Sequence, residues 1–211
     1  MKIGSLKKMF VTYTYIKNRD YTAIEDRFTR NTFIAVDFLY KTNALTITFE
    51  DEGEMKTIDI IDVLVADTVN NITIVPGKRN AYNHRLNSVM FYDTHGAIFR
   101  KNHKKNWFKR NKGTNSPVAL LSHELIHCYN ELYQNSAYLS RKEDKHTHRG
   151  KKIDYDGHDL SFPNAEEAFV IKMTNQVAKR LGEDKRSNYG RNYYATESVL
   201  STKKKKKRNR F

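Results

Sequence analysis

The sequence predicts an α+β fold in which a β-rich N-terminal part precedes two helices. Segments rich in Thr, Ile, Val and Phe follow one another between residues 30 and 95. From Ser116 onward, apolar residues recur at helical spacing instead. With 211 residues, the chain is long enough for one domain with a core of its own. We therefore expect a single domain over residues 1–200.

The β-rich part, residues 30–95, is expected to form an antiparallel or mixed sheet. Its segments alternate partly between apolar and polar residues, and turn-like breaks separate them at 41–43, 50–54, 69–71 and 76–80. We expect strands over residues 32–40, 44–51, 56–67, 71–77 and 88–93. Residues 100–115 are basic and rich in asparagine, which favours a loop.

The helical part, residues 116–182, begins with a clear start signal. Ser116 is a good N-cap, and Pro117 suits the first helical position. The apolar stripe that follows predicts a helix over 117–135. A second helix opens near residues 162–169 and ends at Leu181, before Gly182.

Charge is concentrated at the C-terminus. The net charge is +14, and residues 203–210 contribute seven of these charges, from five lysines and two arginines. We expect residues 201–211 to be a disordered basic tail. Contact of residues 203–210 with nucleic acid or an anionic surface is the alternative.

Composition excludes several classes of protein. A single cysteine, Cys128, excludes an internal disulfide framework and a zinc finger, and we expect it to be a small packed residue. No apolar run approaches 18 residues, so no transmembrane helix is expected. The N-terminus lacks the apolar region of a signal peptide. We expect secretion into a target cell by a signal-peptide-independent system, or otherwise a cytoplasmic protein.

The segment HELIH at 123–127 contains the candidate metal-binding and catalytic residues. His123 and His127 are four residues apart and so share one helix face, where two imidazoles can bind one Zn²⁺. Glu124 lies about 100° further round the helix, near enough to act as a base toward water at the metal. We therefore expect one Zn²⁺ per chain on a zincin-like active-site helix. The alternative is that both histidines are ordinary helix residues.

The third metal ligand must come from elsewhere, because residues 130 and 133 are Asn and Tyr, which excludes the longer metzincin motif. The second helix offers Glu166 and Glu167. Glu166 lies nearer the apolar stripe, where a carboxylate is costly unless a cation pairs with it, so it ranks first. Glu167 ranks second, and His158 or Asp159 third.

Two segments, ALLSHELIHCYNELYQN and EEAFVIKMTNQVAKRLGEDKRSNY, resemble the NleD-like effector zinc metallopeptidases of bacterial pathogens. The resemblance covers about residues 116–190. It implies that His123, Glu124 and His127 are zinc and catalytic residues, and that Glu166 and Glu167 form the family's Glu-Glu pair. It also places Arg186 and Tyr189 on an R-x-x-Y element. Cys128 stands where the family usually has Ala.

The expected function is a zinc endopeptidase, an effector or toxin that cleaves target-cell proteins. Glu124 is the expected general base, and Tyr189 or Arg186 the donor to the oxyanion, with Tyr193 and Tyr194 as alternatives. We expect an extended substrate to add to a sheet edge beside the cleft, with the strand at 88–93 as the candidate edge. The resemblance implies host signalling kinases as substrates. The alternatives are a basic nucleic-acid-associated protein or a protease acting on nucleic-acid-bound proteins.

Overall fold

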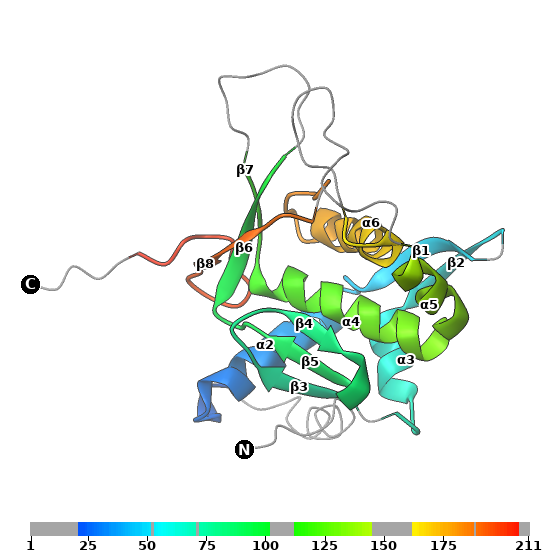
Figure 1. Cartoon of the computed structure of the whole chain (residues 1–211). Coiled ribbons are helices and arrows are strands. Elements are labelled where there is room, and N and C mark those ends of the chain that lie inside the picture. Colours follow the sequence, from blue (N-terminus) through cyan, green and yellow to red (C-terminus); the bar gives the residue numbers. More distant parts are fainter. Residues whose placement is uncertain are drawn as a thin grey trace, which may run out of the picture.

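The computed structural model describes residues 21–51, 53–70, 72–101, 112–144, 162–187 and 189–206. Within them the fold is mixed α and β, as the sequence predicts, with three small sheets arranged around the long helix α4, Pro117–Tyr133 (Figure 1). No described helix has the length and apolar character needed to cross a membrane.

The first helix shows that one strand prediction is wrong. After the short 3-10 helix η1, Tyr21–Ala23, residues 32–40 lie inside helix α2, Arg27–Lys41. The carboxylate of Asp26 caps this helix by accepting a hydrogen bond from the Thr29 N–H at 2.7 Å. Apolar residues at helical spacing bury one face of α2, so packing outweighs the strand preference of Val, Ile and Phe.

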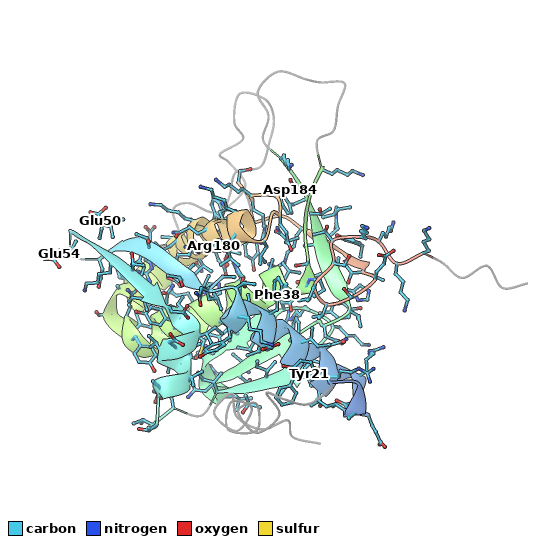
Figure 2. All side chains as sticks on the ribbon, turned by 180° about the vertical axis from the view of Figure 1, so that it is seen from behind. Tyr21, Phe38, Glu50, Glu54, Arg180 and Asp184 are labelled. Carbon is cyan, nitrogen blue, oxygen red and sulfur yellow. The ribbon has the colours of Figure 1, made fainter. Side chains whose placement is uncertain are left out.

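A hairpin and a short helix follow α2. Strands β1, Thr46–Asp51, and β2, Glu54–Asp59, pair antiparallel. The predicted strand at 56–67 is correct only for residues 56–59. Asp59 ends β2, and its side chain caps helix α3, Ile60–Ala66. Seen from behind, Glu50 and Glu54 mark the tip of the hairpin, and Arg180, at the end of the later helix α6, Ala165–Arg180, lies nearer the core (Figure 2). Arg180 Nη1 donates to Ala44 O at 3.2 Å and so joins α6 to the segment before β1.

The second sheet contains β3, Thr73–Pro76, β4, Ala81–Asn83, and β5, Ser88–Phe91, with the 3-10 helix η2, His84–Leu86, between β4 and β5. The strand order is β3-β5-β4. The strand predicted at 88–93 is therefore present as β5, but it is the central strand. The sheet edge beside α4 is instead β4 (Figure 1).

The third sheet corrects the loop predicted at 100–115. Strands β6, His95–Arg100, β7, Lys112–Asn115, and β8, Asn192–Ala195, pair antiparallel in the order β7-β6-β8. The predicted loop thus includes one end of β6 and all of β7, while residues 102–111 lie outside the described residues. The close approach of strands at Gly113 leaves no room for a Cβ, which would lie 2.3 Å from the Phe99 ring.

Three described helices, α4, α5 and α6, lie in the C-terminal half of the chain. The predicted helix at 117–135 is α4, which ends at Tyr133 and is followed directly by α5, Asn135–Glu143. The second predicted helix is α6, Ala165–Arg180, capped by Asn164 and followed by Gly182 in a left-handed conformation. Helix α4 is buried continuously from Pro117 to Asn130, and α6 packs along it.

The described part of the expected basic tail is attached to the fold. Lys203 O accepts a hydrogen bond from Glu197 N, and Lys205 N donates to Ala195 O, both near 3 Å. The backbone of Lys204 forms an isolated antiparallel β-bridge with that of Thr196. Their side chains are exposed, and residues 207–211 lie outside the described residues.

Candidate metal centre

A small polar cavity of about 100 Å³ lies beside the middle of α4. His123, Glu124 and His127 form one wall, and Glu167 of α6 and Tyr189 form others. Strand β4 and helix α5 complete the boundary. The structure therefore brings together residues from both helices that the sequence singled out.

Three of these residues form a group that could hold a metal ion: His123, His127 and Glu167. The Nε2 atoms of the two histidines are 3.2 Å apart. Glu167 Oε2 lies 3.3 Å from each of these nitrogens. Ligand atoms about 2.0–2.1 Å from a tetrahedral zinc lie roughly 3.3 Å from one another. The triangle therefore has the dimensions of three zinc ligands.

The outer nitrogens of the two rings fix where their protons lie. The Thr174 hydroxyl donates to Val170 O at 2.8 Å, so it can only accept from Nδ1 of His123, which is 3.2 Å away. The ionised carboxylate of Glu166 likewise only accepts, and it lies 3.3 Å from Nδ1 of His127. When both rings are neutral, each carries its proton on Nδ1 and directs the Nε2 lone pair toward Glu167 Oε2. A positive charge between three acceptors that face one point stabilises them, so the group could hold a metal ion or a proton.

The pKa values of His123, His127 and Glu167 also indicate that this group favours a positive charge. Burial lowers the pKa of His123 to about 3. Although burial also acts against protonation of His127, its hydrogen bonds to the carboxylates of Glu166 and Glu167 raise its pKa to about 10. Burial is likewise outweighed at Glu167, where the two imidazoles hold the pKa of the carboxyl below its usual value. A single positive charge is thus strongly favoured inside this buried group.

Glu166, the first-ranked ligand in the sequence analysis, lies on the far side of His127, away from the metal group. Its side chain is completely buried, and its carboxylate pairs with Arg141 Nε at 2.5 Å and accepts from Asn130 Nδ2 at 2.8 Å. The sequence argument that a cation must accompany this buried carboxylate is sound, but the cation is Arg141. The group that could hold a metal ion contains Glu167, the second-ranked candidate, and not Glu166.

Glu124 is buried within the cavity wall, with 3% of its surface exposed. Burial raises the pKa of its carboxyl, and nearby cationic groups act in the opposite direction. The nearest arginine is Arg191, whose Nη2 lies 3.9 Å from Glu124 Oε1. The Glu124 carboxylate is thus shielded from water, but it has the Arg191 guanidinium beside it.

Tyr189, which the resemblance singled out, lines the cavity, and burial raises the pKa of its phenol to about 12. Arg186 does not line the cavity. Its Nη2 donates to Tyr189 O at 2.7 Å, and its backbone N–H donates to Asn175 Oδ1 at 2.7 Å. Arg186 therefore lies behind Tyr189 and holds that segment in place.

The sequence analysis missed Arg191, which lies beside Glu124 and within 5.6 Å of the rings of Tyr189 and Tyr193. One signal could have found it, since residues 191–194 repeat the R-x-x-Y spacing of 186–189. Arg141 and Asn130 were missed as well. No spacing predicts them, because they meet Glu166 across separate helices.

Of the remaining candidates, those within the described residues do not line the cavity. His158 and Asp159 lie outside the described residues. Tyr194 is nearly buried, and its hydroxyl donates to Thr202 O at 2.6 Å. The hydroxyl of Tyr193 lies 3.4 Å from Asn80 N, which donates to it. Cys128 is fully buried, which confirms its packing role.

Comparison of the chain with protein-family models, with curated proteins and with solved structures gives no match. The resemblance to NleD-like peptidases therefore remains a prediction from the motifs.

Proposed function

We propose that the protein is a zinc-dependent endopeptidase. The observation that carries this proposal is the convergence of His123 Nε2, His127 Nε2 and Glu167 Oε2, 3.2–3.3 Å apart, beside the buried carboxylate of Glu124. Two nitrogen ligands and one oxygen ligand suit zinc, and three protein ligands leave a coordination position for substrate chemistry. Water and a peptide carbonyl are the natural reactants for such a site.

Glu124 is the proposed general base. A zinc ion bound to the group would polarise the scissile carbonyl and make water more acidic. Glu124 takes the proton from the attacking water and delivers it to the leaving amine. Burial raises the pKa of its carboxyl, which makes the carboxylate a stronger base, while Arg191 favours the ionised form that accepts the proton.

Tyr189 is the proposed donor to the oxygen on which negative charge develops. Its phenol lines the same cavity, and with a pKa of about 12 it stays protonated at neutral pH. A donor fixed before the reaction stabilises the developing oxyanion without reorganisation. Arg186 holds the Tyr189 backbone through the 2.7 Å hydrogen bond to its carbonyl, which makes it a positioning residue.

The cavity borders a sheet edge suited to an extended polypeptide. Ala81 and Tyr82 of β4 line the cavity, and β4 pairs with β5 along one side only. A substrate segment could add to β4 as a further strand, with backbone hydrogen bonds that do not depend on its sequence. This arrangement supports an endopeptidase more than an enzyme that trims chain ends.

The biological setting is proposed from the motifs alone. The resemblance to NleD-like effectors supports a secreted effector or toxin that acts on signalling proteins, including kinases, of a target cell. A proteomic search for new peptide ends in cells that express the wild type, but not Glu124→Gln, would identify such substrates.

Zinc content and peptide cleavage test the proposal together. We expect about one zinc per chain in both the wild type and Glu124→Gln, with cleavage of a denatured protein pool only by the wild type. Equal cleavage by both proteins would refute the role of Glu124. Absence of bound zinc in a correctly folded wild type would refute the metal site.

A second candidate function is binding to nucleic acid, favoured by one surface observation. Lysines 203–206 are exposed, and a groove on the outer side of α6 is lined by the cations Lys172, Lys179, Arg180 and Lys185. Neutralised phosphates would make binding steeply salt-dependent. Binding of single-stranded DNA at two salt concentrations, with and without residues 203–211, measures this directly.

A further inference from the structure

The metal cavity contains a cation that the proposed chemistry does not use. Lys142 lies near the end of α5, and its side chain lines the cavity together with Tyr138. The Lys142 ammonium lies 5.5 Å from the centre of the Tyr138 ring, which is 3% exposed and so offers a fixed surface. A cation over an aromatic face is held by the ring quadrupole. The ammonium is therefore pre-positioned at the cavity.

The carboxylates of the cavity are directed to partners other than Lys142. Glu167 faces the two imidazoles at 3.3 Å, and Glu124 lies beside Arg191. Among the ion pairs of the described residues, none joins Lys142 to a carboxylate. With respect to the described residues, the ammonium is thus available to an anionic group that enters with the substrate.

A second unused donor lies across the cavity. Asn80 is 3% exposed, and its Oδ1 accepts the Tyr92 N–H at 2.9 Å, which fixes the orientation of the amide. Its Nδ2 has no hydrogen-bond partner within the described part of the chain, and the residue lines the cavity. A buried unpaired donor is costly, so its natural partner is a group on a ligand. A neutral amide suits a substrate carbonyl, which leaves the charged contact to Lys142.

We propose that Lys142 selects substrates with an anionic side chain next to the bond that is cleaved. This inference rests on the proposed peptidase function and adds its substrate class. Asp, Glu and phosphorylated residues share the required chemistry, a negatively charged oxygen that accepts from the ammonium. A lysine or arginine at the same substrate position would be repelled.

Peptide binding tests the selection separately from catalysis. Zinc-loaded Glu124→Gln binds peptides without cleaving them, so affinity can be measured by fluorescence anisotropy. The probes are matched peptides with Asp, Glu, phosphoserine, Gln or Lys at each position near the scissile bond. At one position we expect the acidic peptides to bind about tenfold tighter than the Gln peptide, because a hydrogen bond to a charged group contributes about that factor. Comparison of the Asp peptide with the phosphoserine peptide shows whether Lys142 prefers a carboxylate or a phosphate.

Charge reversal at Lys142 supplies the decisive comparison. In the Glu124→Gln background, Lys142→Glu should remove the preference for acidic peptides and create one for Lys. The matched control, Lys172→Glu on the outer side of α6, changes the net charge equally and should keep the acidic preference. An unchanged preference in Lys142→Glu, or an equal change in Lys172→Glu, would overturn the inference.

Peptide cleavage by the wild type distinguishes failure of this inference from failure of the proposed peptidase function. If the wild type cleaves peptides and acidic residues bring no advantage, the selection by Lys142 is wrong and the peptidase stands. If the wild type binds zinc but cleaves no peptide, the proposed function and the inference fail together.

Discussion

Nδ1 of His127 lies 3.3 Å from Oε1 of Glu166, on the side of the imidazole ring away from His123 and Glu167. The two adjacent glutamates of α6 therefore contact His127 from opposite sides. Glu167 completes the metal group, and Glu166 orients the ring and holds the proton on Nδ1. A one-residue step along α6 thus separates the proposed metal ligand, Glu167, from Glu166, which supports His127.

This difference predicts unequal losses of zinc affinity in two isosteric variants. Glu167→Gln removes a charged ligand and should release most of the zinc. Glu166→Gln keeps the three residues of the metal group and removes the anionic support of His127, so it should weaken zinc binding by about 10–100-fold. Competition with a chelator of known affinity measures both. A larger loss in Glu166→Gln than in Glu167→Gln would assign the ligand to Glu166 instead.

Tyr189→Phe should reduce kcat about 100-fold with little change in KM, because removal of one oxyanion donor costs roughly that factor in the chemical step. Zinc content should be unchanged, since Tyr189 is not part of the metal group. Tyr133→Phe, on the same helix as the histidines but outside the cavity wall, is the control. Full activity in Tyr189→Phe would exclude the donor role.

Arg141→Met should destabilise the metal-free protein by about 3–5 kcal/mol, because it leaves the Glu166 carboxylate buried without its cation. The double variant Arg141→Met/Glu166→Gln should recover much of this loss, since the uncompensated charge is gone. Urea unfolding of the four proteins gives the coupling free energy. Additive effects of the two substitutions would show that the pair does not interact.

Asp67 predicts a pH-dependent contribution to stability. Its carboxylate accepts from the Tyr133 hydroxyl at 2.5 Å and from Asn70 N at 2.8 Å, and so joins the end of α3 to α4. Although burial opposes it, these hydrogen bonds lower the pKa of Asp67 to about 2 from 3.8. Since the folded pKa is depressed, the stabilisation is complete above about pH 4 and is lost as the pH falls toward 2.

The variant Asp67→Asn isolates this effect. The difference in free energy of unfolding between wild type and Asp67→Asn should be largest above about pH 4 and should shrink as the pH falls toward 2. Urea midpoints of the metal-free proteins at several pH values provide the measurement. A difference that stays constant with pH would mean that Asp67 titrates alike in the folded and unfolded states.

Zinc should also stabilise the fold, because α4 and α6 each supply ligands and the ion binds only when they are together. At a free zinc concentration about 1,000 times Kd, linkage contributes about 4 kcal/mol, which raises Tm by roughly 10 °C. Thermal unfolding with zinc and with a chelator measures the shift. The shift should nearly vanish in Glu167→Gln, and an equal Tm in the wild type under both conditions would argue against a bridging ion.

The sequence was a good guide where a pattern is local. Helix α4 could be predicted because Ser116, Pro117 and the apolar spacing are all consecutive signals, and HELIH places two imidazoles on one face by helical geometry alone. Helix α2 could not, because Val, Ile and Phe suit a strand or a buried helix equally well. Its packing against α4 decides between them.

By itself the sequence determined the α+β class, the two imidazoles and the adjacent carboxylate of Glu124, since each depends on residues close together in the chain. Only the tertiary structure decided that Glu167 meets the imidazoles, that Arg141 neutralises Glu166, and that Arg191 and Lys142 lie at the cavity. The physical reason is that these contacts depend on the rotation and axial position of α6, α5 and the segment after α6 relative to α4. Packing of the whole core fixes those quantities, and no local spacing encodes them.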